Sequence, residues 1–131
     1  MCFYIHVSYS VIKTAEENIV CYKRLSYAFA ELSLDRIKEL EIRKNTLISP
    51  YQHMKYRIRE THTSVLRRDS RNPFAISLGL HSYTNLLAAE SNTNSGEVIV
   101  KCIIPKGARY YVDPVREHYV SNKLRTVKIV R

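Results

Sequence analysis

Apolar and polar residues alternate along several stretches of the chain, and this period of two predicts β-strands. Residues 98–104 are the clearest case, because they are apolar on both faces and are interrupted only by Lys101. A strand that is apolar on both faces is usually central in its sheet. Pro105-Lys106-Gly107 then predicts a tight turn, and residues 110–112 predict the returning strand.

The same period recurs in residues 3–9, and residues 19–25 and 124–130 also have the composition of strands. In residues 54–59, Tyr56 and Ile58 alternate with three cations, so a strand here displays those cations on one surface. Residues 60–73 are polar and basic, which predicts an exposed loop. We therefore expect most of the chain to form a sheet.

Helical spacing replaces alternation over residues 26–45, which predicts an amphipathic helix packed on that sheet. A shorter helix is expected over residues 84–91 with Thr84 as its N-cap, and a helical turn over residues 14–17. The expected fold class is therefore α+β. It is a single domain over residues 1–131, with a curved or barrel-like mixed β-sheet, one longer amphipathic helix and one or two short helices.

Composition places the chain among globular proteins, since 45% of its 131 residues are hydrophobic and 25% are charged. Its three cysteines, Cys2, Cys21 and Cys102, lie far apart, and its five histidines lack metal-ligand spacing, so no metal is expected. The chain shows neither a secretory signal pattern nor an apolar run long enough to cross a membrane. We expect a cytoplasmic protein that does not bind a membrane.

The net charge of +9 is concentrated in two segments. Residues 55–71 contain six Lys or Arg against two acids, and residues 101–131 contain eight against two. Clustered cations favour a phosphate backbone, and interleaved tyrosines can stack on unpaired bases. An acidic protein surface, or no charged partner at all, are the alternatives. The residues predicted to bind nucleic acid or another partner are Lys55, Arg57, Arg59, Arg67, Arg68, Arg71, Lys106, Arg109 and Tyr110.

Candidate catalytic groups do not form a complete set in the sequence. There is no Gly-x-Ser-x-Gly nucleophile elbow and no glycine-rich phosphate loop. The strongest candidate for a small-ligand site is His81, Ser82 and Tyr83, a histidine and two hydroxyls at the end of an expected strand. The sequence therefore favours binding over catalysis, with no catalytic residue and no cofactor.

Three pieces of the chain resemble a small uncharacterised domain of bacterial genomes and their phages. They are Val20-Cys-Tyr-Lys23, Gly79-Leu-His-Ser-Tyr83 and Val98-Ile-Val-Lys-Cys-Ile-Ile-Pro-Lys-Gly107 followed by Tyr119-Val-Ser-Asn-Lys-Leu124. The resemblance implies a phage or mobile-element setting in a bacterial host cell. In that setting an anti-defence protein is expected, such as an anti-CRISPR inhibitor that contacts an RNA-guided nuclease or its RNA.

The same pieces are more distantly similar to the ADP-ribosyltransferase fold. That likeness implies a nucleotide or ADP-ribose site formed by Lys23, or Tyr22 in its place, together with His81, Ser82 and Tyr83. The family's catalytic Glu falls near Ser121 and Asn122 in this chain, and neither is an acid. The main expectation is a non-catalytic basic protein that binds RNA, DNA or a protein–RNA complex, and an ADP-ribose-binding or transferring protein is the alternative.

Overall fold

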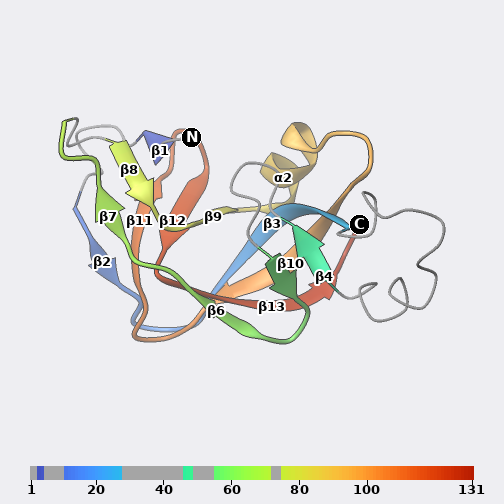
Figure 1. The fold of residues 1–131 in the computed structure, drawn as a ribbon, viewed down its shortest axis with the longest axis horizontal. Coiled ribbons are helices and arrows are strands. Elements are labelled where there is room, and N and C mark those ends of the chain that lie inside the picture. The colour runs from blue at the N-terminus through green and yellow to red at the C-terminus, as the bar shows by residue number, and fades with distance from the viewer. Residues whose placement is uncertain (1–2, 5–10, 28–45, 49–54, 72–74) are drawn as a thin grey trace.

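The computed structural model describes residues 3–4, 11–27, 46–48, 55–71 and 75–131, and these are mostly β-strands (Figure 1). The strands are β1 (Phe3–Tyr4), β2 (Lys13–Thr14), β3 (Ile19–Tyr27), β4 (Thr46–Ile48), β5 (Lys55–Arg57), β6 (Thr61–Thr63), β7 (Arg67–Arg68), β8 (Ala75–Leu78), β9 (Leu80–Tyr83), β10 (Glu97–Ile104), β11 (Arg109–Asp113), β12 (His118–Ser121) and β13 (Lys123–Ile129). The helix of the described part is α2 (Leu86–Asn92).

All described strand pairs are antiparallel. One sheet has ten strands, with the path β2-β11-β12-β9-β3-β10-β13-β6 and with β4 and β5 attached beside β3. A second sheet has the order β1-β8-β7. Short links explain the pairing, because a parallel pair needs a crossover of a dozen or more residues. Between β11 and β12, for example, which pair with each other, the link is residues 114–117.

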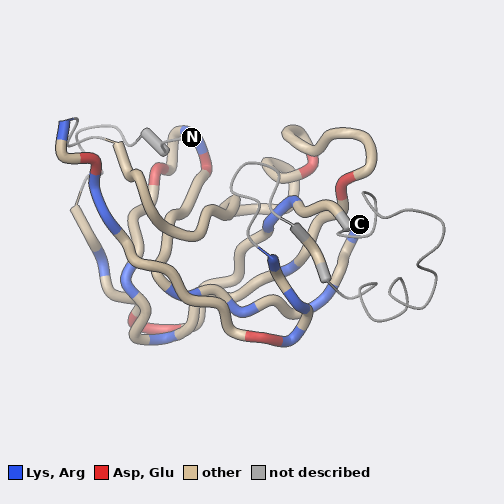
Figure 2. The backbone as a smooth tube through the Cα atoms, viewed as in Figure 1, with Lys and Arg blue, Asp and Glu red and all other residues tan. Residues whose placement is uncertain are grey.

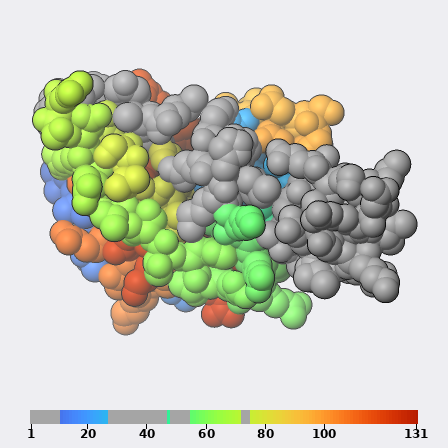
Figure 3. Space-filling view, in the orientation of Figure 1, coloured from blue at the N-terminus to red at the C-terminus, as the bar shows by residue number. Residues whose placement is uncertain are grey.

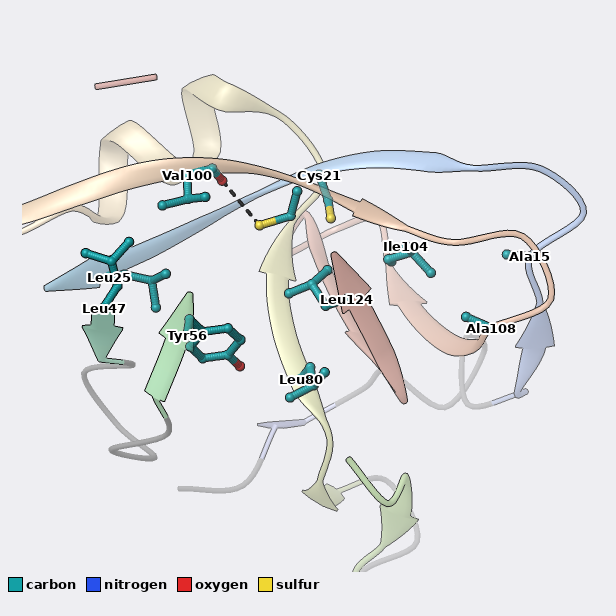
Figure 4. Close-up of a cluster of buried hydrophobic side chains, with 11 residues drawn as sticks. Ala15, Cys21, Leu25, Leu47, Tyr56, Leu80, Val100, Ile104, Ala108 and Leu124 are labelled. Atoms are coloured by element: carbon teal, nitrogen blue, oxygen red, sulfur yellow. Dashed lines mark hydrogen bonds between the residues drawn. The ribbon is translucent and has the colours of Figure 1, made fainter. Parts of the chain in front are cut away.

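The core forms on one side of the large sheet, where β3 and β10 pair along their whole lengths (Figure 4). Alternate residues of both strands point to this side, and Cys21 lies directly opposite Cys102. Leu47, Tyr56 and Leu124 approach the same cluster from β4, β5 and β13. Below, this side is called the inner face. The opposite, outward side is called the outer face.

The helix α2 packs against β3 and β9. Its N-cap is Asn85, whose side-chain Oδ1 accepts a hydrogen bond from the Ala88 N–H at 2.8 Å. Arg24, on the outer face of β3, donates to the Asn92 carbonyl at 2.6 Å and pairs with Glu97 at 3.4 Å. A nearly buried guanidinium thus binds the end of the helix to the sheet.

A second cluster of buried residues, Ile76, Tyr111 and Val120, lies between the two sheets, with Leu66 packed against it. Gly79, between β8 and β9, has a φ of +154°. A Cβ built on Gly79 would lie 2.3 Å from Val120 Cγ1 and 2.9 Å from Leu66 Cδ1. Only glycine therefore fits here, because the side chains of Val120 on β12 and of Leu66 lie directly against its backbone.

We expect Gly79→Ala to destabilise the fold by about 3 kcal/mol, since the methyl group overpacks Val120 and the backbone conformation is unfavourable for alanine. Chemical denaturation measures this change. The control is Gly96→Ala, where a Cβ would meet nothing within 4 Å although φ is also positive. Equal losses in both variants would show that backbone conformation alone, and not the close approach, requires Gly79.

The structure corrects the expected fold class. The described chain is not α+β with a mixed barrel-like sheet, because its helical content is one short helix and its large antiparallel sheet does not close into a barrel. The longer helix was expected over residues 26–45. Ser26 belongs instead to β3, which ends at Tyr27, and residues 28–45 lie outside the described part.

Several local expectations are also corrected. Residues 14–17 form no helical turn, because Thr14 ends β2 and bends follow it. Within residues 60–71, part of the expected loop, the chain forms β6 and β7. The cap of α2 is Asn85 rather than Thr84. The strands expected over residues 19–25, 98–104 and 110–112 are confirmed, and β10 is central as predicted.

Candidate functional site

The cations of β5 point away from the core. Lys55 and Arg57 are exposed, and Tyr56 between them is fully buried, as the alternation predicts. Arg59 was expected on the same strand, but it lies in the turn after β5 with a φ of 66°. Its side chain is nevertheless exposed. The strand and its turn therefore present three cations to solvent.

β13 presents three more cations on the outer face, Lys123, Arg125 and Lys128. Leu124 and Thr126 between them are buried on the inner face. The register between β13 and β10 shifts at Lys101 and Cys102, which leaves one extra residue in β13. Because of this shift Lys128 lies opposite Lys101. The bulge thus places the Lys128 side chain on the outer face near the end of β13.

Thr126 brings these two groups together. The Arg59 N–H donates to the Thr126 carbonyl at 2.9 Å, and the Thr126 hydroxyl donates to the Arg57 carbonyl. The turn after β5 therefore lies directly beside β13, and Figure 3 shows residues 55–71 in green meeting the last strand in red. We call the six exposed cations of this region the cationic face: Lys55, Arg57, Arg59, Lys123, Arg125 and Lys128.

The cationic face is poor in acids. Over residues 55–63 and 123–129 the one acid is Glu60. Within the described part, ion pairs join Arg24 to Glu97, Arg116 to Asp113 and Arg131 to Glu90, and none involves the cationic face. Figure 2 shows the same imbalance, with blue segments along β5 and β13 and a single red segment at the turn. The positive charge there is free to attract an external anion.

The structure separates Arg67, Arg68 and Arg71 from the cationic face. Arg67 and Arg68 form β7 of the second sheet, which Figure 1 shows at the left, away from β4, the partner of β5. Arg68 Nε donates to the Tyr111 hydroxyl at 3.0 Å, and its guanidinium lies 5.3 Å from the centre of that ring. Arg68 therefore has a structural role between the sheets. The basic segment 55–71 is one patch in sequence but not in space.

Lys106 and Arg109 are exposed, whereas Tyr110 is packed against the core. The Arg109 N–H donates to Asn122 Oδ1 at 2.9 Å, which places Arg109 beside the start of β13 and so next to the cationic face. The Tyr110 ring stacks edge-on against Tyr119 at 5.8 Å. Of these three predicted residues, Arg109 extends the cationic face and Tyr110 supports the fold.

The tyrosine rings of the described part are largely occupied by packing. Tyr56 and Tyr111 are buried, and Tyr83 packs against the His118 ring at 4.7 Å. The remaining rings whose burial is described, Tyr22, Tyr110 and Tyr119, are half-buried. Tyr51, also counted among the tyrosines interleaved with cations, lies outside the described residues. Stacking of bases on exposed tyrosines therefore has no support in the described part.

The predicted small-ligand site is divided by the sheet. Ser82 and Lys23 point to the inner face and are buried, whereas His81 and Tyr83 alternate with Ser82 and point to the outer face. What joins Lys23 to His81 is the backbone, since Lys23 Nζ donates to the His81 carbonyl at 2.5 Å. Four residues that are close in the fold thus do not present their side chains to one ligand.

Lys23 is a buried cation without a carboxylate partner in the described part. Its Nζ lies 5.1 Å from the centre of the Tyr56 ring, and its one hydrogen bond among the described residues is that to the His81 carbonyl. Burial lowers the pKa of Lys23 from 10.5 to about 8. The Tyr56 and Ser82 hydroxyls nearby are buried and have no hydrogen-bond partner among the described residues. The inner face therefore contains a buried ammonium group, that of Lys23, whose burial is unfavourable for the folded state.

Burial also controls the other titratable groups beside Lys23. It raises the pKa of the Cys21 thiol to about 11, although the nearby Ser82 hydroxyl opposes part of that rise, and it raises the pKa of Cys102. Burial, with Lys23 and His118 as smaller causes, lowers the pKa of His81 to about 3. Thiols that stay protonated at pH 7 are poor nucleophiles, and an imidazole with so low a pKa is a weak base. These groups are part of the fold rather than of a reactive centre.

Sequence reasoning missed Lys123, Arg125 and Lys128 as site residues. The signal was present, because Lys123 and Arg125 alternate with Leu124 and Thr126 as Lys55 and Arg57 alternate with Tyr56. The third cation breaks that alternation through the bulge. A strict period of two therefore could not place Lys128 on the same face.

The described residues contain no group of three His, Cys, Asp or Glu side chains that could hold a metal ion. No helix in the described part has the length and apolar character to span a membrane. Comparison with known proteins found no matching family model, no similar curated protein and no similar solved structure.

Proposed function

We propose that this protein binds nucleic acid by contacting its phosphate backbone with the cationic face. The observation that carries the proposal is the set of six exposed cations on adjacent backbones, with Glu60 as the one acid among them. Each phosphate that a Lys or Arg neutralises releases counterions, so the contributions add when the cations lie together. A rigid antiparallel sheet holds them together without further ordering.

Two features favour binding rather than catalysis at this surface. The polar groups beside the cations are the hydroxyls of Thr61 and Thr63, which lie opposite Arg125 and Lys123 across the ladder. Hydroxyls and cations are the usual ligands of phosphate oxygens. The buried Lys23, Ser82 and Tyr56 lie on the inner face, so they do not reach a ligand on the cationic face.

The setting implied by the sequence resemblance is compatible with this function. A phage protein that binds phosphate backbones can act on free RNA or DNA, or on the nucleic acid of an RNA-guided nuclease. The small-ligand alternative is disfavoured by the opposite orientation of Ser82 and His81. We therefore do not propose an ADP-ribose site.

The test is the fluorescence anisotropy of a labelled 20-base-pair duplex, titrated with the protein at several potassium chloride concentrations. With five or six phosphate contacts, the logarithm of the binding constant should fall against the logarithm of salt with a slope of about −5. A slope near zero, or no binding at about 50 mM salt, would contradict the proposal. An acidic protein partner, or no charged partner at all, would then be the remaining explanations of the charge.

A further inference from the structure

The apolar neighbours of the cationic face suggest how it distinguishes nucleic acids. Ile103 lies opposite Arg125 on β10, and Val20 lies opposite Ile103 on β3 with 45% of its surface exposed. Neither side chain can donate or accept a hydrogen bond. Among the described residues of the outer face, the uncharged groups beside the cations that can hydrogen-bond are therefore the Thr61 and Thr63 hydroxyls, which suit phosphate oxygens.

Base stacking is equally unsupported at this surface. Proteins that prefer single strands combine cations with exposed aromatic rings, and each stacked base contributes about 1–3 kcal/mol. The Tyr56 ring is buried beneath β5, and the rings of Tyr110 and Tyr119 pack on each other. None of the described tyrosines lies exposed among the six cations. From the described residues of this surface, a single strand thus gains only phosphate contacts, and it loses flexibility when it binds.

The cations themselves are fixed in a regular arrangement. Lys123 and Arg125 are two residues apart on one strand, so their Cα atoms are about 7 Å apart. β6 and β13 are neighbours in the sheet, about 5 Å apart, and the bond from Arg59 to Thr126 fixes the turn after β5 beside them. A fixed backbone spacing of cations matches a rigid polyanion better than a flexible one, because the Lys and Arg side chains must be ordered on binding but a rigid partner need not be.

From these observations we infer that the partner is double-stranded nucleic acid, bound along its phosphates without regard to sequence. The inference rests on the proposed function of the cationic face. A duplex carries one charge per about 1.7 Å of axis, and each contact contributes a salt slope of about 0.9 against about 0.7 for a single strand. Over five contacts at about 0.1 M salt, that difference corresponds to roughly tenfold in affinity.

The experiment compares three labelled probes with the full-length protein at about 0.1 M salt: a 20-base-pair duplex, one of its strands alone, and a duplex of scrambled sequence. We expect the two duplexes to bind equally and about tenfold more tightly than the strand. A strand that binds as tightly as the duplex, or a preference between the two duplexes, would overturn the inference while the proposed function stands. Failure of all three probes to bind would overturn the proposed function itself.

Discussion

Replacing Lys23 by methionine should stabilise the protein by about 2 kcal/mol at pH 7. Burial lowers the pKa of Lys23 from 10.5 to about 8, and this difference corresponds to roughly 3 kcal/mol of unfavourable free energy in the folded state. Methionine has a similar length and needs no hydrogen bond, but it leaves the His81 carbonyl without its side-chain donor. The net gain should raise Tm by roughly 6–10 °C.

The same substitution should change how stability depends on pH. Between pH 8 and 10.5 the unfolded lysine binds more protons than the folded one, so wild type gains stability relative to Lys23→Met as pH rises through that window. The raised pKa values of Cys21 and Cys102 act in the opposite direction above about pH 9. Both proteins contain these thiols, so below about pH 9 the difference between their unfolding free energies reports on the lysine; above it the difference also contains the effect of Lys23 on the thiols, whose pKa values it lowers.

The control for Lys23 is Lys13→Met on β2, where the lysine is exposed and stability should change by less than about 0.5 kcal/mol. Denaturant unfolding at pH 7, 8, 9 and 10 provides the comparison. A Lys23→Met variant that is less stable than wild type would show that the hydrogen bond and the contact with Tyr56 outweigh the burial of charge.

Reversing Lys123, Arg125 and Lys128 to Glu should reduce affinity for a duplex by at least 10²–10³-fold. Each lost phosphate contact lowers the logarithm of the binding constant by about 0.9 at about 0.1 M salt, taking 1 M salt as the reference. Repulsion between the new carboxylates and the phosphates adds to the loss. The three side chains lie exposed on the outer face, so the fold should remain. Circular dichroism and Tm within a few degrees of wild type would verify this.

The matched control reverses Lys13, Arg67 and Arg71, which are exposed on β2, on β7 and in the turn after it. Both triple variants change the net charge by six, from +9 to +3. If charge alone attracts the duplex, the two variants lose affinity equally. If the residues of the cationic face bind the duplex, the β13 variant loses far more affinity than the control variant.

Reversing Lys55, Arg57 and Arg59 to Glu is the companion test on the other half of the cationic face. We expect binding to be lost without unfolding, because these side chains lie in water and their backbone contacts to Thr126 remain. The same anisotropy assay measures the affinity. Unchanged affinity would remove β5 and its turn from the cationic face and restrict it to β13.

The sheet was predictable where alternation is strict and less so where it is interrupted. β5 follows from apolar residues at every second position, β10 from a segment that is apolar on both faces, and β3 from a strand-like composition. In contrast, β12 has half-buried His118 and Tyr119 followed by buried Val120 and Ser121. No period of two survives in that order. Whether the large sheet closes into a barrel was not predictable either. Alternation within each strand does not determine whether the strands at the two ends of the sheet pair with each other.

The site was partly predictable for the same reason. Lys55 and Arg57 follow from the period of β5, but their neighbour in space is β13, which is far away in the sequence. Arg67 and Arg68 are adjacent to β5 in the sequence and belong to a different sheet. For β3, sequence alone does not show that Lys23 and Arg24 are both buried on opposite faces. Long-range pairing decides these outcomes.

One salt titration tests the cationic face most directly. Arg125→Gln removes one cation from β13, and Arg71→Gln removes one from the turn after β7, with the same change in charge and side chain. The account predicts that the slope for duplex binding becomes shallower by about 0.9 in Arg125→Gln and stays at the wild-type value in Arg71→Gln. Equal slopes in the two variants would contradict it.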